Sequence, residues 1–99
     1  MDWNGKTAFI TGGVSGIGFG IAQAFAAAGM RLVLSYRNEE YRERAARWFA
    51  DNNYAAQQFV HLDVTDRGRF ADVAEQVGKV HVLVNNAGVA IGGPVEYLP

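Results

Sequence analysis

The chain has 99 residues, 49% of them hydrophobic and 19% charged, which is typical of one small globular domain or part of one. A net charge of −1 gives no electrostatic reason to bind nucleic acid or an anionic membrane, and the absence of cysteine excludes disulfides and thiolate metal sites. No signal peptide and no membrane-spanning apolar run is recognisable, so we expect a cytoplasmic protein.

The first predicted elements are a strand over 7–11, a glycine-rich loop and a helix over 17–28. Apolar residues recur at helical spacing in this helix, and we expect them to form its apolar stripe: Ile17, Ile21, Ala24, Phe25 and Ala28. Unpaired backbone N–H groups and the helix dipole attract an anion to a helix start, and glycines let a pyrophosphate approach the backbone. This order predicts a dinucleotide-binding loop, although glycines also make plain turns.

The glycine spacing excludes two common nucleotide-binding loops. A Walker loop needs lysine and then serine or threonine after its last glycine, but Gly18 is followed by Phe19. The pattern G-x-G-x-x-G also fails, because its third glycine would fall on Ile21 or Gln23. The pattern that fits is Thr11-Gly12-x-x-x-Gly16-Ile17-Gly18.

A second strand over 31–35 leads to a helix over 39–51, with Asn38 as its expected N-cap. We expect this helix to bury Tyr41, Ala45, Trp48 and Phe49. Tyr36 and Arg37 follow the strand, where we expect both to contact the cofactor, and no carboxylate comes before Glu39. A carboxylate suits the ribose hydroxyls of NAD and a cation suits the 2′-phosphate of NADP, so Arg37 predicts NADP(H) over NAD(H); a plain surface arginine is the alternative.

The third strand, over 58–63, ends in Asp63-Val64, and a helix over 66–77 follows with Thr65 or Asp66 as its cap. This helix is expected to bury Phe70, Val73, Ala74 and Val77. Asp63 could accept a hydrogen bond from an adenine amino group, or it could cap the helix instead. We interpret His61 and His81 as structural histidines, because no third metal ligand lies at useful spacing, and we predict no metal site.

The fourth strand, over 80–85, ends in Asn85-Asn86-Ala87-Gly88. Two amides at this point can tie neighbouring strand ends together, although alone the segment could be an Asn-rich turn. The strands lie too far apart in sequence for hairpins, so we predict an α/β fold: a doubly wound parallel sheet of Rossmann type, βαβαβαβ, with strand order 3-2-1-4. The last strand would then be a bare edge, so we expect residues 1–99 to be the N-terminal NAD(P)-binding part of one longer domain; completion by another subunit is the alternative.

Taken together, the glycine motif, Asp63-Val64 and Asn85-Asn86-Ala87-Gly88 resemble the short-chain dehydrogenase/reductase family over nearly the whole chain. The resemblance implies that the pyrophosphate and nearby ribose are surrounded by Gly12, Ser15, Gly16, Ile17 and Gly18. It implies that Asp63 and Val64 meet the adenine, and that Asn86, Ala87 and Gly88 line the adenosine ribose. Family members with a basic residue at the position of Arg37 generally prefer NADP(H), and homo-oligomers are common among them.

The family's catalytic serine, Tyr-x-x-x-Lys pair and further asparagine lie beyond the Asn-Asn-Ala-Gly motif, and no Tyr-x-x-x-Lys occurs in these residues. We therefore assign no catalytic residue here and expect it after residue 99. The expected function is an NADP(H)-dependent oxidoreductase that transfers hydride between the nicotinamide and a small carbonyl or alcohol substrate. The alternatives are a non-catalytic dinucleotide-binding module and a nucleotide-binding α/β domain without hydride chemistry.

Overall fold

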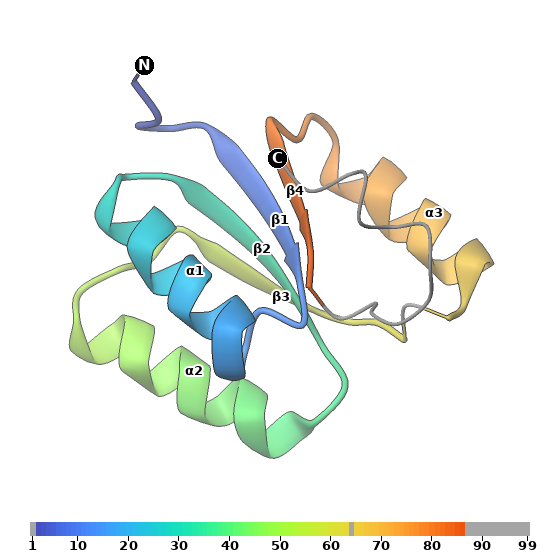
Figure 1. Ribbon diagram of the computed structural model, residues 1–99, viewed down its shortest axis with the longest axis horizontal. Coiled ribbons are helices and arrows are strands. Elements are labelled where there is room, and N and C mark those ends of the chain that lie inside the picture. Colours follow the sequence, from blue (N-terminus) through green and yellow to red (C-terminus); the bar gives the residue numbers. More distant parts are fainter. Residues whose placement is uncertain (1, 64, 87–99) are drawn as a thin grey trace.

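The computed structural model describes residues 2–63 and 65–86 of the chain. Strands and helices alternate along the whole of this part, as the sequence predicts (Figure 1). The elements are β1 (Thr7–Thr11), α1 (Gly16–Ala27), β2 (Arg31–Tyr36), α2 (Glu39–Asp51), β3 (Gln57–His61), α3 (Arg67–Val77) and β4 (Val82–Asn85).

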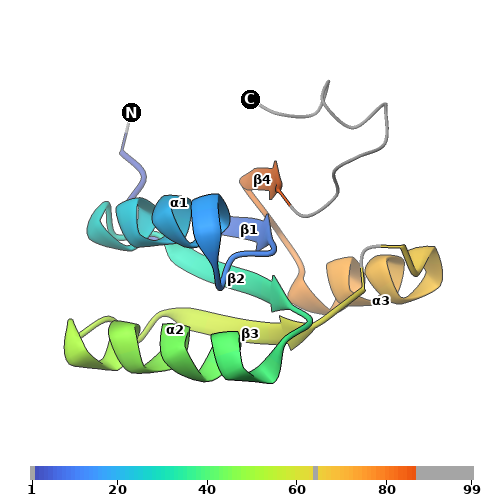
Figure 2. The same ribbon diagram turned by 60° about the horizontal axis from the view of Figure 1, so that its bottom comes forward.

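The four strands form one parallel sheet in the order β3-β2-β1-β4, which confirms the predicted fold class and strand order. Ala8 of β1 lies between Leu32 of β2 and Val82 of β4. Helices α1 and α2 cover one face of this sheet, and α3 covers the other (Figures 1 and 2). All four strands therefore end at the same edge, which is where a doubly wound sheet presents its ligand crevice.

Side chains alternate between two cores along the central strands. Ala8 and Ile10 join the larger core under α1 and α2, and the intervening Phe9 joins the smaller core under α3. In the smaller core Phe9 stacks on Phe70 with 5.9 Å between ring centroids. Because both faces are covered, β1 and β2 are almost fully buried, as expected for central strands of a parallel sheet.

The apolar stripe predicted for α1 coincides only in part with its buried face, because Ile21 and Phe25 alone of its members pack against the core. The helix buries Gly18, Ala22 and Ala26, whereas Ile17 is 77% exposed. Of the other expected core positions, Ile21 and Phe25 are half-buried and Ala24 and Ala28 are exposed. The buried face consists of the smallest residues, which let the helix backbone approach the sheet closely, and apolar periodicity does not distinguish such a face.

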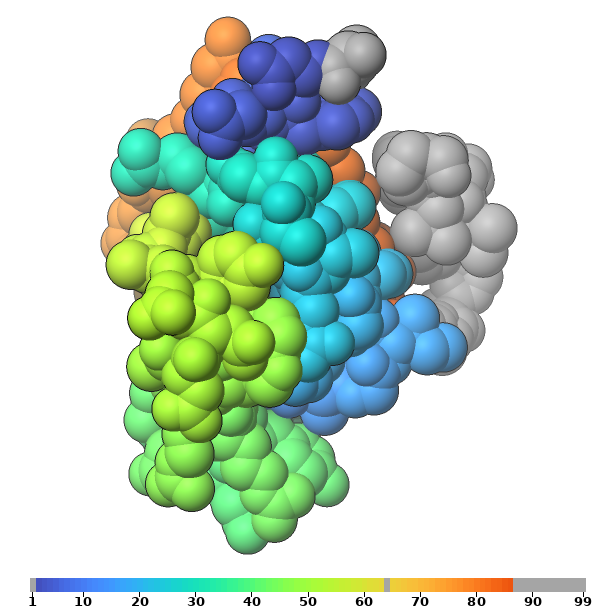
Figure 3. Space-filling view, turned by 90° about the vertical axis from the view of Figure 1, so that its left-hand side faces the viewer, coloured from blue at the N-terminus to red at the C-terminus, as the bar shows by residue number. Residues whose placement is uncertain are grey.

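Helix α2 follows the prediction at its middle but not at its start. Ala45 and Phe49 are fully buried and Trp48 is half-buried, but Tyr41 is 42% exposed, contrary to the prediction. Phe49 lies at the centre of an aromatic cluster between the two helices and the sheet, with Phe19, Trp48, Tyr54 and Phe59 around it. Figure 3 shows α1 and α2 lying against each other as one continuous layer on this side.

The ends of the later elements differ by one or two residues from the prediction. Strand β3 ends at His61, although the N–H of Leu62 still donates to the carbonyl of Tyr36 at 3.0 Å. Strand β4 begins at Val82, although the N–H of His81 donates to the carbonyl of Thr7 at 2.8 Å. In α3, Val73 is buried as predicted, Phe70 and Val77 are half-buried, and Ala74 is exposed, which corrects its assignment to the core.

Side chains cap the starts of α2 and α3 as the sequence predicts. Asn38 Oδ1 accepts from the N–H of Tyr41 at 3.1 Å, and Asp66 Oδ1 accepts from the N–H of Arg69 at 3.0 Å. Gly29, after α1, has a φ of +84°, a left-handed conformation that favours glycine and turns the chain into β2. Among residues 2–63 and 65–86, no helix is both long and apolar enough to cross a membrane.

Candidate cofactor-binding site

The loop between β1 and α1 is held by hydrogen bonds from both neighbouring strands. The N–H of Gly12 donates to Ser35 Oγ at 3.0 Å, and Asn86 Nδ2 donates to the carbonyl of Gly12 at 3.3 Å. Ser35 ends the buried part of β2, and Asn86 follows β4 directly. Residues far apart in sequence thus fix the backbone of Gly12 at the carboxyl edge of the sheet.

The two asparagines tie strand ends together, as predicted. Asn85 Oδ1 accepts from Thr11 Oγ1 at 3.2 Å, and Asn86 reaches the next residue of the loop. Thr11 and Asn85 are partners in the β1–β4 register, so their side chains meet at the end of the ladder. The Asn-Asn pair therefore has a structural role here, and its contact with a cofactor ribose stays a prediction.

Gly18 has to be glycine because of how closely α1 approaches this loop. A Cβ at position 18 would lie 2.3 Å from the carbonyl oxygen of Gly12 and 2.7 Å from Asn86 Nδ2. Any side chain would therefore collide with the bond that joins the loop to β4. Gly16 has a φ of +56°, in the left-handed region, so the chain enters the helix through a turn that favours glycine.

The start of α1 is open to a ligand. Ser15 is the N-cap residue, yet its side chain makes no capping hydrogen bond, and the first turn holds no acidic residue. Ser15, Gly16 and Ile17 are exposed. Because the first N–H groups of a helix have no carbonyl partner within it and the dipole is positive there, this end suits an anion such as a pyrophosphate.

A cavity of about 240 Å³ opens between this loop, the end of β2 and the start of α2. It brings together four of the predicted site residues: Gly12, Ser15, Tyr36 and Arg37. It is also lined by residues that the sequence analysis did not assign to a site: Val14, Ser35, Asn38, Tyr41 and Leu62. Ser35 could have been noticed in the sequence, because it is the only hydroxyl residue in the otherwise mostly apolar strand over 31–35. Tyr41 could not, because its helical spacing is that of a core residue.

Arg37 and Asp63 face each other across the ends of β2 and β3. Arg37 Nη2 lies 3.7 Å from Asp63 Oδ2. The N–H and hydroxyl of Thr65 donate to Asp63 Oδ1 at 3.0 and 2.7 Å, and these bonds, with the nearby Arg37 charge, lower the pKa of the carboxyl group from 3.8. Asp63 is thus not the cap of α3, which is Asp66, and it lies beside the cavity residue Arg37 without lining the cavity itself. Val64, Ala87 and Gly88 lie outside the described residues.

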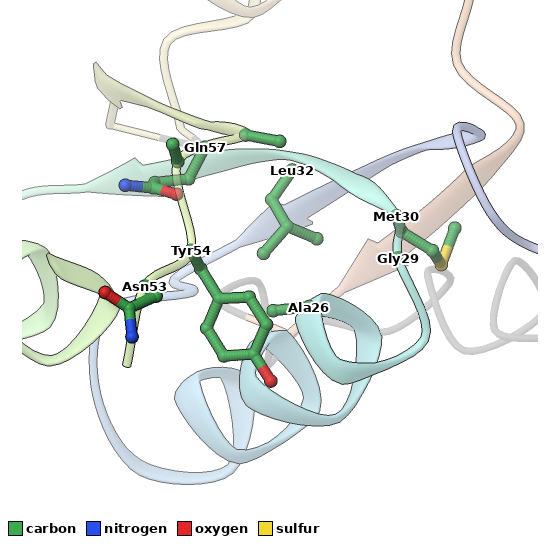
Figure 4. Close-up of a pocket in the computed structure, with 9 residues that line it drawn as sticks. Ala26, Gly29, Met30, Leu32, Asn53, Tyr54 and Gln57 are labelled. Carbon is green, nitrogen blue, oxygen red and sulfur yellow. The ribbon is translucent and has the colours of Figure 1, made fainter. Parts of the chain in front are cut away.

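A second cavity, of about 130 Å³, lies at the opposite, amino-terminal end of β2 and β3 (Figure 4). The ring of Tyr54 lies beside Ala26 and Leu32 there, and no lining side chain carries a charge. This cavity has neither a helix N-terminus nor a cation for a phosphate group. Its lining therefore does not suit a dinucleotide.

The histidines have no metal-binding environment in the described part of the chain. His81 Nδ1 accepts a hydrogen bond from the N–H of Thr7 at 3.0 Å, which gives this side chain a structural partner. The ring of His61 packs edge-on against Tyr36 with 5.4 Å between centroids. Within residues 2–63 and 65–86, no group of three or more histidine, cysteine, aspartate or glutamate side chains could hold a metal ion.

The sequence profile of the short chain dehydrogenase family matches residues 6–99. The chain belongs to this family. The match confirms the resemblance that the glycine loop and the Asn-Asn pair indicate. Oxidoreductases of this family bind a nucleotide cofactor and act on small molecules, and both their cofactor and their substrate differ between members.

Curated and solved short-chain dehydrogenases show how far the similarity reaches. The NADP-dependent (R)-specific alcohol dehydrogenase of Lentilactobacillus kefiri is 35% identical, over 93% of this chain and 37% of its own length. The L-sorbose reductase of Gluconobacter frateurii, solved with NADPH and L-sorbose, has a TM-score of 0.78 and 34% identity, over 100% of this chain and 40% of that one. A family member from Burkholderia phymatum, solved with NAD, has a TM-score of 0.76 and 39% identity, over 90% and 33%.

The chain spans less than half the length of the curated relatives that it matches. The similarity therefore covers the part of a short-chain dehydrogenase that carries the glycine loop and the four strands described above. Activity, substrate and partners belong to the whole protein and are treated as proposals below.

Proposed function

We propose that this chain is the cofactor-binding part of an NADP(H)-dependent short-chain dehydrogenase, which transfers hydride between the nicotinamide and a small carbonyl or alcohol substrate. The observation that carries the cofactor preference is Arg37. Arg37 lines the cavity at the end of β2, where an NAD-binding fold offers a carboxylate to the ribose hydroxyls. A guanidinium at this point matches the geometry and charge of a 2′-phosphate.

The pyrophosphate would lie at the open start of α1, beside Gly12, Ser15, Gly16, Ile17 and Gly18. The adenine would lie toward Asp63 and Val64, and the adenosine ribose toward Asn86, Ala87 and Gly88. The structurally similar L-sorbose reductase was solved with NADPH, which supports a preference for NADP(H). The similar Burkholderia phymatum protein was solved with NAD. The cofactor preference of this chain therefore has to be tested on its own residues.

We place the catalytic residues after residue 99, because residues 1–99 contain no Tyr-x-x-x-Lys pair. In that arrangement the chain's own residues bind and orient the cofactor, and proton transfer to the substrate oxygen belongs to the following segment. A cytoplasmic homo-oligomer that acts on a soluble small molecule completes the proposal. The second candidate is a non-catalytic dinucleotide-binding module.

The test compares the affinities of NADPH and NADH for the protein and for Arg37→Gln. A charge-assisted hydrogen bond contributes about 1.5–3 kcal/mol, so we expect NADPH to bind about 10- to 100-fold more tightly than NADH. Arg37→Gln should remove most of this preference by weakening NADPH alone. Arg47→Gln is the matched control, since Arg47 is an exposed arginine on α2 that does not line the cavity.

Two results would contradict the proposal. An unchanged NADPH-to-NADH ratio in Arg37→Gln would make Arg37 a plain surface residue. In the longer protein that we propose, binding of NADPH without any NADPH-dependent reduction across a panel of small ketones and aldehydes would favour the non-catalytic module.

A further inference from the structure

We propose that Tyr41 is a second residue that selects for NADP(H), with its hydroxyl donating a hydrogen bond to the 2′-phosphate that Arg37 binds. The inference rests on the proposed function and deepens it. It assigns part of the cofactor specificity to α2, an element that the glycine and asparagine motifs do not include.

The first observation is the position of Tyr41. By periodicity it belongs to the same helix face as Ala45 and Phe49, which are fully buried, yet its side chain is 42% exposed. It lines the cavity at the carboxyl edge of the sheet together with Ser15 and Arg37. A large side chain that leaves the core at this point is available to a ligand.

The second observation is that the start of α2 holds Tyr41 in place. The N–H of Tyr41 is bonded to Asn38 Oδ1, and Asn38 itself lines the cavity. Tyr41 is thus fixed through its backbone by the residue next to Arg37 in the chain. Arg37, Asn38 and Tyr41 all line the cavity from the start of α2. The helix dipole of α2 is positive at this end, which favours an anion.

The third observation concerns charge. Glu39 and Glu40 in the first turn of α2 would repel a phosphate, but each is paired with an arginine farther along the helix. Glu39 pairs with Arg42, and Glu40 Oε1 lies 3.2 Å from Arg44 Nη2. These pairs offset the two negative charges beside the cavity.

The same two arginines lie near the two tyrosine rings of the cavity. The guanidinium carbon of Arg44 is 5.8 Å from the ring centroid of Tyr41, and that of Arg42 is 5.8 Å from the ring centroid of Tyr36. A cation close to an aromatic ring is attracted to it, so Arg44 helps to hold the ring of Tyr41 in place. The neutral hydroxyl of Tyr41 can donate a hydrogen bond to a phosphate.

The experiment measures binding of two cofactor fragments, 2′,5′-ADP and 5′-AMP, to the native protein by isothermal titration calorimetry. The fragments differ only in the 2′-phosphate, so their ratio isolates the contact with that group. We expect Tyr41→Phe to weaken 2′,5′-ADP about 3- to 10-fold, the range of one hydrogen bond, and to change 5′-AMP less than about 2-fold. Tyr54→Phe is the matched control, because Tyr54 lines the second cavity at the other end of the sheet.

The outcomes separate this inference from the proposed function. An unchanged affinity of Tyr41→Phe for 2′,5′-ADP would overturn the inference. An equal loss of affinity for both fragments would also overturn it, because it would show that Tyr41 contacts only the adenosine part. Wild-type protein that binds 2′,5′-ADP no better than 5′-AMP would overturn the NADP(H) preference itself. Because Tyr41 is exposed and keeps its ring in Tyr41→Phe, the substitution leaves the fold intact.

Discussion

Two serines at the edge of the same cavity have opposite surroundings. Ser35 is 1% exposed and its Oγ accepts the N–H of Gly12, so it holds the loop. Ser15 is exposed at the N-cap of α1, and its side chain makes no capping bond. One hydroxyl therefore belongs to the fold, and the other is placed for a ligand.

This difference predicts opposite results for the two alanine variants. Ser35→Ala leaves the part-buried N–H of Gly12 without this acceptor and should lower the free energy of unfolding by about 1–3 kcal/mol. Ser15→Ala removes no capping hydrogen bond seen among residues 2–63 and 65–86, so it should change the free energy of unfolding by less than about 0.5 kcal/mol, while weakening NADPH binding. Urea denaturation and an NADPH titration on both variants check this. Equal losses of stability would show that Ser15 also supports the loop.

The sequence predicted the site residues that follow from backbone geometry and from charge. The sequence alone predicts a dinucleotide-binding loop from the glycines at a strand-to-helix turn. It likewise predicts a preference for NADP(H) from an arginine at a position where NAD-binding folds have a carboxylate. The roles of Ser35 and Tyr41 could not be predicted, because they depend on what each side chain faces in the folded chain. Ser35 faces the N–H of Gly12, and Tyr41 lines an open cavity.

At the scale of elements, the sequence predicted the order of the helices and strands and their bounds to within two residues. Glycines and caps mark these bounds, as at Asn38 and Gly29. The buried face of α1 could not be predicted from apolar spacing. The helix approaches the loop so closely that position 18 has to be glycine, and the other positions on this face are small for the same reason. The more hydrophobic Ile17 is left exposed at the cofactor side.

A pair of leucine substitutions in α1 tests this corrected face. Ala22 is fully buried against the sheet, so Ala22→Leu should overpack the core and lower the free energy of unfolding by about 1–3 kcal/mol. Ala24 is exposed, so Ala24→Leu should change it by less than about 0.5 kcal/mol. Chemical denaturation measures both. The predicted stripe, which included Ala24, requires the reverse order.

At the scale of the molecule, the parallel sheet brings together groups that are distant in sequence. Thr11, Gly12 and Ser35 meet Asn85 and Asn86 only because β1 lies between β2 and β4. Strand order followed from the crossover lengths and the handedness rule, so this convergence at one edge was predictable. The exact hydrogen bonds were not, because they depend on register between strands.

This arrangement predicts that cofactor binding and catalysis separate in the 99-residue chain. The described residues supply the helix start, Arg37 and the strand-end asparagines, whereas Tyr-x-x-x-Lys is absent from the sequence. A ligand that binds only the folded state stabilises it by about 2.7 kcal/mol at 100 times its Kd, so NADPH at that excess should raise the urea midpoint of this chain. No NADPH should be consumed in the presence of a small ketone, and Arg37→Gln should reduce the shift with NADPH but not with NADH. Consumption of NADPH above the buffer rate would show that a residue within 1–99 donates the proton, and an unmoved midpoint would show that binding needs contacts outside these residues.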